Sequence, residues 1–167
     1  KEMRKKYTAA IALVLSLCIG TGCGKGIREM EFGHEGSGKK ILIAAYPSEY
    51  KKKVAEGLAD RYKDRARVTV MPMRKLNRVD YRKYDVLVII DALMAWQVFN
   101  VESSWFVGKI KEPETLNKLV LYLTAGDPKQ NYRFQGIDCI TGATVMNTEA
   151  DAISRISGKV DAVLNRQ

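Results

Sequence analysis

Apolar residues form four short, nearly continuous runs in the central part of the chain. The runs cover residues 41–46, 67–71, 85–90 and 118–124. Runs of this length are typical of strands that are buried on both faces of a parallel sheet. A fifth strand is predicted over residues 132–140.

Helical spacing of apolar residues separates and follows these runs. Residues 50–62 carry an apolar position every four residues, which predicts an amphipathic helix with one packed and one basic face. Residues 98–105 indicate a second helix. A third is predicted over residues 153–164, preceded by Thr148 and Asp151 at capping-box spacing.

Strands that alternate with helices predict an α/β fold with helices on both faces of a parallel sheet. Five strands in a chain of this length fit a doubly wound sheet of order 2-1-3-4-5. We therefore expect one domain over residues 39–167, which is long enough to bury a hydrophobic core.

The N-terminal residues have the pattern of an export signal. Residues 3–7 are basic, residues 9–19 are almost wholly apolar, and small residues lead into Cys23. Such a pattern predicts a secretory signal, and the apolar stretch is short for a membrane span. The segment resembles the lipobox of bacterial lipoproteins. This resemblance implies that residues 1–22 are removed and that Cys23 carries lipid.

The expected location follows from this signal. A lipidated Cys23 would anchor an exported protein to the bacterial membrane, facing the periplasm or the cell exterior. An uncleaved N-terminal anchor is the alternative, and it also places the domain outside the cytoplasm. Residues 24–38 are rich in glycine and polar residues, so we expect residues 23–38 to be a flexible linker. His34, in this linker, is assigned no role.

Positive charge is concentrated in the first half of the expected domain. The chain has a formal net charge of +9, and residues 39–83 hold 14 Lys and Arg against 5 Asp and Glu. This density favours contact with anionic lipid headgroups or an anionic cell wall, or it is simply a solvated basic helix face. No nucleic-acid-binding motif accompanies the charge, and we expect no nucleic-acid partner.

Three segments resemble the first, third and fourth strands of flavodoxins. These are residues 39–46, 84–90 and 117–123. The resemblance implies a flavodoxin-like fold over residues 39–167 that binds FMN at the carboxyl edge of the sheet. In that family a hydroxyl residue and a glycine of the first loop hold the flavin phosphate. Ser48 matches the hydroxyl, but the glycine is absent and Glu49 places a carboxylate there.

The loop after the third strand contains Trp96. The resemblance makes Trp96 a candidate to stack on the isoalloxazine ring, and the alternative is a tryptophan of the core or its rim. Cys139, with apolar Ile137 and Ile140 nearby, is interpreted as a small buried hydrophobe. No Cys–His pair, metal-ligand cluster or set of catalytic carboxylates can be assembled from the sequence.

A second local motif involves Asp138, Thr141, Gly142 and Thr144. It resembles the Asp-x-x-Ser/Thr-Gly-Ala-Thr sequence of exported FMN-binding domains. That resemblance implies that a flavin transferase attaches FMN to the Thr144 hydroxyl through its phosphate. The alternative is a strand-to-helix turn that needs small residues for structural reasons alone.

These observations predict a membrane-anchored, flavodoxin-like lipoprotein that binds FMN and carries electrons to an unknown redox partner at the cell envelope. An electron carrier fits better than a catalyst with its own substrate. One alternative is a cofactor-free domain that serves as an envelope binding or structural module. Another is a receptor for a small anionic ligand other than flavin.

Overall fold

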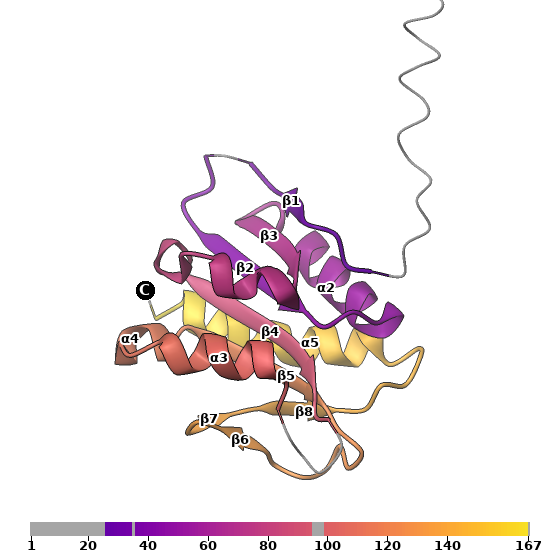
Figure 1. Cartoon of the computed structure of the whole chain (residues 1–167). Coiled ribbons are helices and arrows are strands. Elements are labelled where there is room, and N and C mark those ends of the chain that lie inside the picture. Colours follow the sequence, from indigo (N-terminus) through magenta and orange to yellow (C-terminus); the bar gives the residue numbers. More distant parts are fainter. Residues whose placement is uncertain (1–25, 35, 95–98, 167) are drawn as a thin grey trace, which may run out of the picture.

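The computed structural model describes residues 26–34, 36–94 and 99–166, and these residues form an α/β fold (Figure 1). Its centre is a six-stranded, mostly parallel sheet of order β1-β3-β2-β4-β5-β8. Only β1 runs antiparallel to its neighbour. The strands of this sheet are β1 (Met30–Phe32), β2 (Lys40–Ala45), β3 (Arg67–Pro72), β4 (Val86–Ala92), β5 (Leu119–Thr124) and β8 (Ile140–Gly142).

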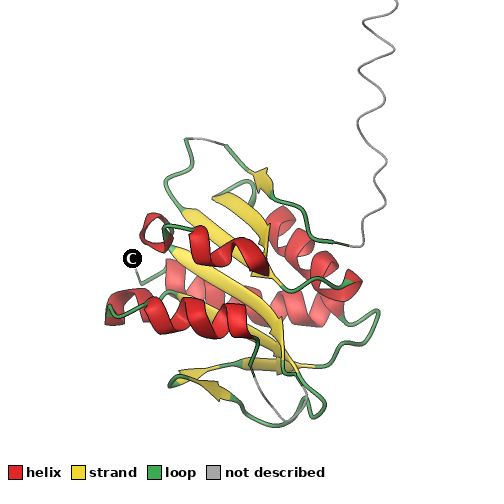
Figure 2. Cartoon of the chain, viewed as in Figure 1, coloured by secondary structure: helices red, strands yellow, loops and turns green. Residues whose placement is uncertain are grey.

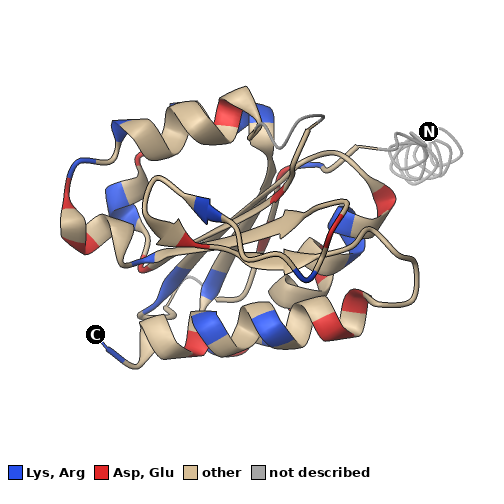
Figure 3. Cartoon of the chain, turned by 90° about the horizontal axis from the view of Figure 1, so that it is seen from below, with Lys and Arg blue, Asp and Glu red and all other residues tan. Residues whose placement is uncertain are grey.

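Helices cover both faces of the sheet (Figures 2 and 3). On one face lie α2 (Glu49–Tyr62) and α5 (Glu149–Leu164). On the other lie α3 (Val101–Lys109) and the short 3-10 helix η1 (Met73–Arg78). The remaining elements are η2 (Tyr81–Lys83), α4 (Pro113–Leu116) and a small antiparallel hairpin of β6 (Arg133–Phe134) and β7 (Ile137–Asp138).

The core is divided between the two faces by the alternation of side chains along each strand. In β2, Ile41 and Ile43 point toward α2 and α5, whereas Leu42 and Ala44 point toward α3 and η1. All four are fully buried. Because both faces are covered, the strand is apolar throughout instead of alternating with polar residues. This is the physical basis of the continuous apolar runs in the sequence.

The predicted α/β fold with a parallel sheet and helices on both faces is confirmed at this level. The four apolar runs form β2, β3, β4 and β5, and the three helical patterns correspond to α2, α3 and α5. The predicted five-stranded, wholly parallel sheet is wrong, because β1 adds a sixth, antiparallel strand at the edge. The fifth predicted strand is also wrong in extent: residues 132–140 contain the β6–β7 hairpin, and β8 begins only at Ile140.

Strand β1 lies inside the segment that we expected to be a flexible linker. Met30, Glu31 and Phe32 pair with β3, and Arg67 forms an ion pair with Glu31 at 2.6 Å. Gly33 follows with a positive φ of 87°. A Cβ at Gly33 would clash with the Ala66 carbonyl oxygen and lie 2.8 Å from that of Lys63, so only glycine lets the chain pass here.

Candidate functional site

The carboxyl ends of the five parallel strands meet at one edge of the sheet, which we call the carboxyl edge. In open α/β sheets this edge is where ligands bind, because the loops that follow the strands gather there. Here the loops follow Ala45, Pro72, Ala92, Thr124 and Gly142. Both α2 and α5 begin at this edge, so their positively polarised N-termini lie there as well.

A cavity of about 370 Å³ opens at the carboxyl edge beside β2 and β3. Tyr46 and Pro47 line it after β2, and Pro72, Met73 and Arg74 line it after β3. Gly26, Ile27, Arg28 and, from α3, Glu102 complete the wall. Its size and its mixture of apolar, aromatic and charged side chains suit a small organic ligand.

Ser48 lies at the carboxyl edge as predicted from its place after β2, and there it is the N-cap of α2. Its Oγ accepts a hydrogen bond from the Lys51 backbone N–H at 3.1 Å. Glu49, the first residue of the helix, is exposed. The Ser48 hydroxyl and the Lys51 N–H, two groups of the predicted phosphate loop, are therefore hydrogen-bonded to each other.

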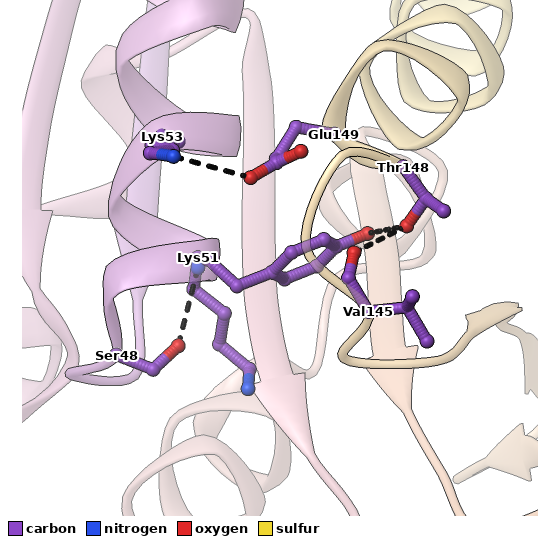
Figure 4. Close-up of polar contacts among 7 residues, drawn as sticks. Ser48, Lys51, Lys53, Val145, Thr148 and Glu149 are labelled. Carbon is purple, nitrogen blue, oxygen red and sulfur yellow. Dashed lines mark hydrogen bonds and ion pairs between the residues drawn. The ribbon is translucent and has the colours of Figure 1, made fainter.

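The start of α2 is tied to the start of α5 (Figure 4). The Tyr50 hydroxyl lies 3.5 Å from Thr148 Oγ1, and Lys53 Nζ lies 3.6 Å from the Glu149 carboxylate. Thr148 in turn donates a hydrogen bond to the Val145 carbonyl at 2.7 Å and makes no side-chain cap on α5. The predicted capping box is therefore wrong, because this hydroxyl faces the preceding loop instead of the helix.

This contact brings two predicted site segments together. Ser48 immediately precedes α2, and Thr144 lies in the loop between β8 and α5, with its side chain exposed. Val145 and Met146 of the same loop are about half exposed. The structure thus places Ser48 and Thr144 in neighbouring loops at the carboxyl edge, although they are far apart in the sequence.

The motif around Thr144 is divided between different environments. Thr141 and Gly142 are buried in β8. Thr141 Oγ1 has no hydrogen-bond partner among the described residues. Gly142 lies against the ring of Tyr122, whose Cζ would be 2.8 Å from an added Cβ. Asp138 belongs to β7 and is exposed, and its carboxylate accepts a hydrogen bond from Arg133 Nε at 2.8 Å.

The structure therefore does not bring Asp138 together with Thr144. It precedes β8, at the opposite end of that strand from the carboxyl edge. Cys139, beside it, is partly buried against the core on the α3 side, and burial raises the pKa of its thiol to about 11. A thiol with that pKa is a poor nucleophile at neutral pH.

Two charged residues that the sequence analysis did not single out are buried under the carboxyl edge. Lys51 in the first turn of α2 is 3% exposed, and Asp91 at the end of β4 is 1% exposed. Burial lowers the pKa of Lys51, partly opposed by the charge of Asp91. Burial likewise raises the pKa of Asp91, opposed by hydrogen bonds from Ser103 Oγ at 2.5 Å and the Ala92 N–H at 2.8 Å.

The sequence does contain a signal for this buried pair. Lys51 precedes Val54 and Ala55 by three and four residues, so it lies on the packed face of α2. Asp91 directly continues the most apolar strand. Lys51 Nζ also lies 5.8 Å from the centre of the Tyr46 ring, which lines the cavity. A buried cation therefore stands close to the cavity wall.

Trp96 and Cys23, both predicted functional residues, lie outside the described residues. Among the described residues, no group of three or more His, Cys, Asp and Glu side chains is placed to hold a metal ion. Within the same part of the chain, no helix is both long and apolar enough to cross a membrane.

We compared the chain with known proteins in three ways. A scan against protein-family models, a search of curated proteins and a search of solved structures each return no match to the chain.

Proposed function

We propose that this chain is an exported lipoprotein, anchored to the bacterial membrane through Cys23, that binds FMN at the carboxyl edge and transfers electrons at the cell envelope. Its redox partner would approach the same edge. Bound FMN supplies the reversible electron uptake, and the protein holds it and controls its surroundings. The observation that carries the proposal is the meeting of the Ser48 and Thr144 loops at the N-termini of α2 and α5.

A flavodoxin-like arrangement of the five parallel strands is part of this proposal. It is supported by their spatial order, β3-β2-β4-β5-β8, in which the first strand in sequence lies between the second and the third. The crossover connections change direction between β2 and β4, and the cavity lies on the other side of β2, beside β3. Strand β1 would be an addition outside this unit.

The residues present fit the chemical groups of FMN in several respects. The α2 N-terminus favours an anionic phosphate, and Thr144 is exposed, as an ester bond at its hydroxyl requires. Tyr46 and Met73 offer apolar and aromatic surface to a flavin ring in the cavity. The exposed carboxylate of Glu49 opposes a phosphate at this helix, through repulsion of like charges.

The test is the absorbance spectrum of the exported protein, produced together with a flavin transferase, before and after acid precipitation. Flavin that stays with the precipitated protein would be covalent, and Thr144→Ala should abolish it while Thr144→Ser retains a hydroxyl acceptor. Flavin released into the supernatant would be bound without a covalent bond. An adduct that survives Thr144→Ala would contradict the assignment of Thr144.

A cofactor-free envelope module is the second candidate, and two observations favour it. Ser48 is occupied in capping α2, and the packing of Tyr122 accounts for Gly142 without any flavin. In this case the exported protein would be colourless and would not change the spectrum of added FMN.

A further inference from the structure

The outer surface of α3 exposes two large apolar side chains one helical turn apart. Val101 is 73% exposed and Trp105 is 65% exposed. The opposite side of the same helix is fully packed, since Phe106 and Val107 are buried against the sheet. The exposed pair is therefore a second apolar stripe that the fold leaves uncovered.

Lys109 lies beside this stripe, and further basic residues come from the neighbouring helix η1. Lys109 Nζ lies 4.9 Å from the centre of the Trp105 ring and also donates a hydrogen bond at 3.4 Å to the Asn77 carbonyl of η1. The Asn77 amide reaches back to the Glu102 carbonyl at 3.4 Å, so α3 and η1 lie side by side. The α3–η1 face comprises Val101, Trp105 and Lys109 from α3 with Arg74, Lys75 and Arg78 from η1.

The charge of this face differs from that of the opposite one. Helices η1 and α3, both fully described, contain four basic residues and one carboxylate, Glu102. On the other side of the sheet, α2 and α5 together contain six basic and six acidic residues. Lys75 is paired with Glu29, which lessens but does not cancel the positive charge of the α3–η1 face.

We propose that the α3–η1 face binds the headgroup region of an anionic lipid bilayer. Tryptophan with flanking lysine and arginine is the combination that partitions into this region, because the ring enters the apolar boundary while the cations meet lipid phosphates. Val101 and Trp105 protrude from the outer surface of α3. A bilayer can deform around protruding side chains and needs no preformed groove. The proposal rests on neither bound flavin nor the lipid on Cys23.

Such contact would fix the orientation of the domain on the membrane. The N-terminus of α3 lies at the carboxyl edge, and Arg74 and Glu102 also line the cavity there. A bilayer that contacts the α3–η1 face would therefore hold the mouth of the cavity next to the membrane surface. Lipid-soluble molecules at that surface would then have access to it.

The experiment uses the chain from Gly24 onward, which lacks Cys23 and contains every described element of the fold. It is sedimented with vesicles of phosphatidylcholine alone or of equal parts phosphatidylcholine and phosphatidylglycerol. We expect binding only to the anionic vesicles, with loss of binding at high salt. Trp105→Ala should reduce binding several-fold, and Lys109→Glu should reduce it at least about fivefold, as expected for the loss of one cation at an anionic surface.

The matched control is Lys159→Glu, the same charge reversal at an exposed position of α5 on the opposite face. It should leave vesicle binding nearly unchanged. In a Trp96→Phe background Trp105 is the sole tryptophan, so its fluorescence should shift to the blue with anionic vesicles and be quenched by brominated lipid.

Three results would overturn the proposal. These are no binding to anionic vesicles, equal loss of binding in the Lys109→Glu and Lys159→Glu variants, or Trp105 fluorescence that does not respond to vesicles. Capture of an acidic protein by this face without vesicle binding would assign the surface to a protein partner instead. Circular dichroism of each variant shows whether the protein is still folded, so that loss of vesicle binding is not mistaken for unfolding.

Discussion

Gly142 lies directly against the hydroxyl end of Tyr122, where there is no room for a side chain. An added Cβ would overlap Tyr122 Oη and lie 2.8 Å from Cζ and 3.0 Å from Cε2. Tyr122 is held in place because its hydroxyl is 3.0 Å from that of Tyr50 in the buried core. The glycine of the predicted flavin motif thus has a packing role of its own.

Gly142→Ala should therefore destabilise the protein by about 1–3 kcal/mol, the usual range for overpacking in a well-filled core. Urea denaturation measures the change in the free energy of unfolding. Gly158→Ala is the matched control: nothing lies within 4 Å of its added Cβ, and it should stabilise α5 by about 0.5–1 kcal/mol.

The Tyr122→Phe change tests the cause of this destabilisation. It removes the hydroxyl that the new methyl group would meet first, so it should recover part of the stability lost in Gly142→Ala. If Gly142→Ala costs the same free energy of unfolding in the parent protein and in Tyr122→Phe, the strain arises elsewhere.

Ser48 allows capping to be separated from phosphate binding. Ser48→Ala removes the acceptor for the Lys51 N–H and should cost about 1 kcal/mol in the free energy of unfolding. Ser48→Asp keeps a good capping oxygen, so stability should be close to that of the parent protein. Its added negative charge should nevertheless weaken binding of FMN at the α2 N-terminus.

The measurements are urea denaturation and FMN titration of both variants. A Ser48→Asp protein that is stable and binds FMN as well as the parent would place the phosphate away from this helix. Ser154→Ala, at an exposed position of α5, controls for the simple removal of a hydroxyl.

The surface cluster of Arg82, Tyr81 and Glu112 gives a prediction on pH. Arg82 Nη2 lies 3.0 Å and the Tyr81 hydroxyl 3.2 Å from the Glu112 carboxylate. The hydrogen bond from Arg82 is the main reason that the pKa of Glu112 is lowered from 4.5 to about 2. A lowered carboxyl pKa stabilises the fold above pH 4.5, and that contribution is lost as the pH falls toward 2.

Arg82→Ala should raise the pKa of Glu112 toward 4.5. The loss of stability that Glu112 causes between pH 4.5 and 2 should then disappear. A carboxyl carbon NMR titration follows this residue directly. Lys83→Ala, which removes the neighbouring cation paired with Asp80, should leave the pKa of Glu112 in place. An unchanged pKa in Arg82→Ala would contradict the assigned cause.

The elements that the sequence predicted are those in which burial repeats at a regular spacing. Strand β4 is buried along nearly its whole length, and α2 buries one stripe, so both leave clear patterns. Strand β1 has only three residues and no fully buried one, which is too short a pattern to recognise.

The β6–β7 hairpin turns at Gln135 and Gly136, both with positive φ. Glutamine seldom occupies that conformation, so the usual turn signal is missing.

The candidate site was predictable to the extent that it depends on topology. Ser48 and Thr144 each follow a parallel strand, so they had to lie at the same edge of the sheet. Asp138 was grouped with Thr144 because the two are close in sequence, whereas the three residues of β8 separate them in space. Lys51 lies on the packed face of α2 and Asp91 continues an apolar strand, so the burial of each leaves a local signal. Which groups these two residues meet depends on how α2, β4 and α3 pack together, and no local pattern specifies that.

The Lys51–Asp91 pair yields a prediction that depends on this packing. Asp91→Ala leaves the Ser103 hydroxyl and the Ala92 N–H without their acceptor and removes a negative charge near a buried lysine, so it should cost about 1–3 kcal/mol. In a Lys51→Met background the same change should cost less, because no buried cation loses its partner. The difference between the two costs, the coupling free energy, should be about 0.5–3 kcal/mol.

The pH dependence of stability gives an independent check on the same pair. Because burial lowers the pKa of Lys51, the unfolded chain binds this proton more tightly, and stability should rise with pH as the lysine titrates below 10.5. Because burial raises the pKa of Asp91, stability should fall as the pH rises from 3.8 through its folded pKa. Urea denaturation across the pH range should show the alkaline rise in the parent protein and its absence in Lys51→Met. Two results together would show that these charges do not interact. The free-energy costs of the two substitutions would be additive, and stability would still rise with pH in Lys51→Met as it does in the parent protein.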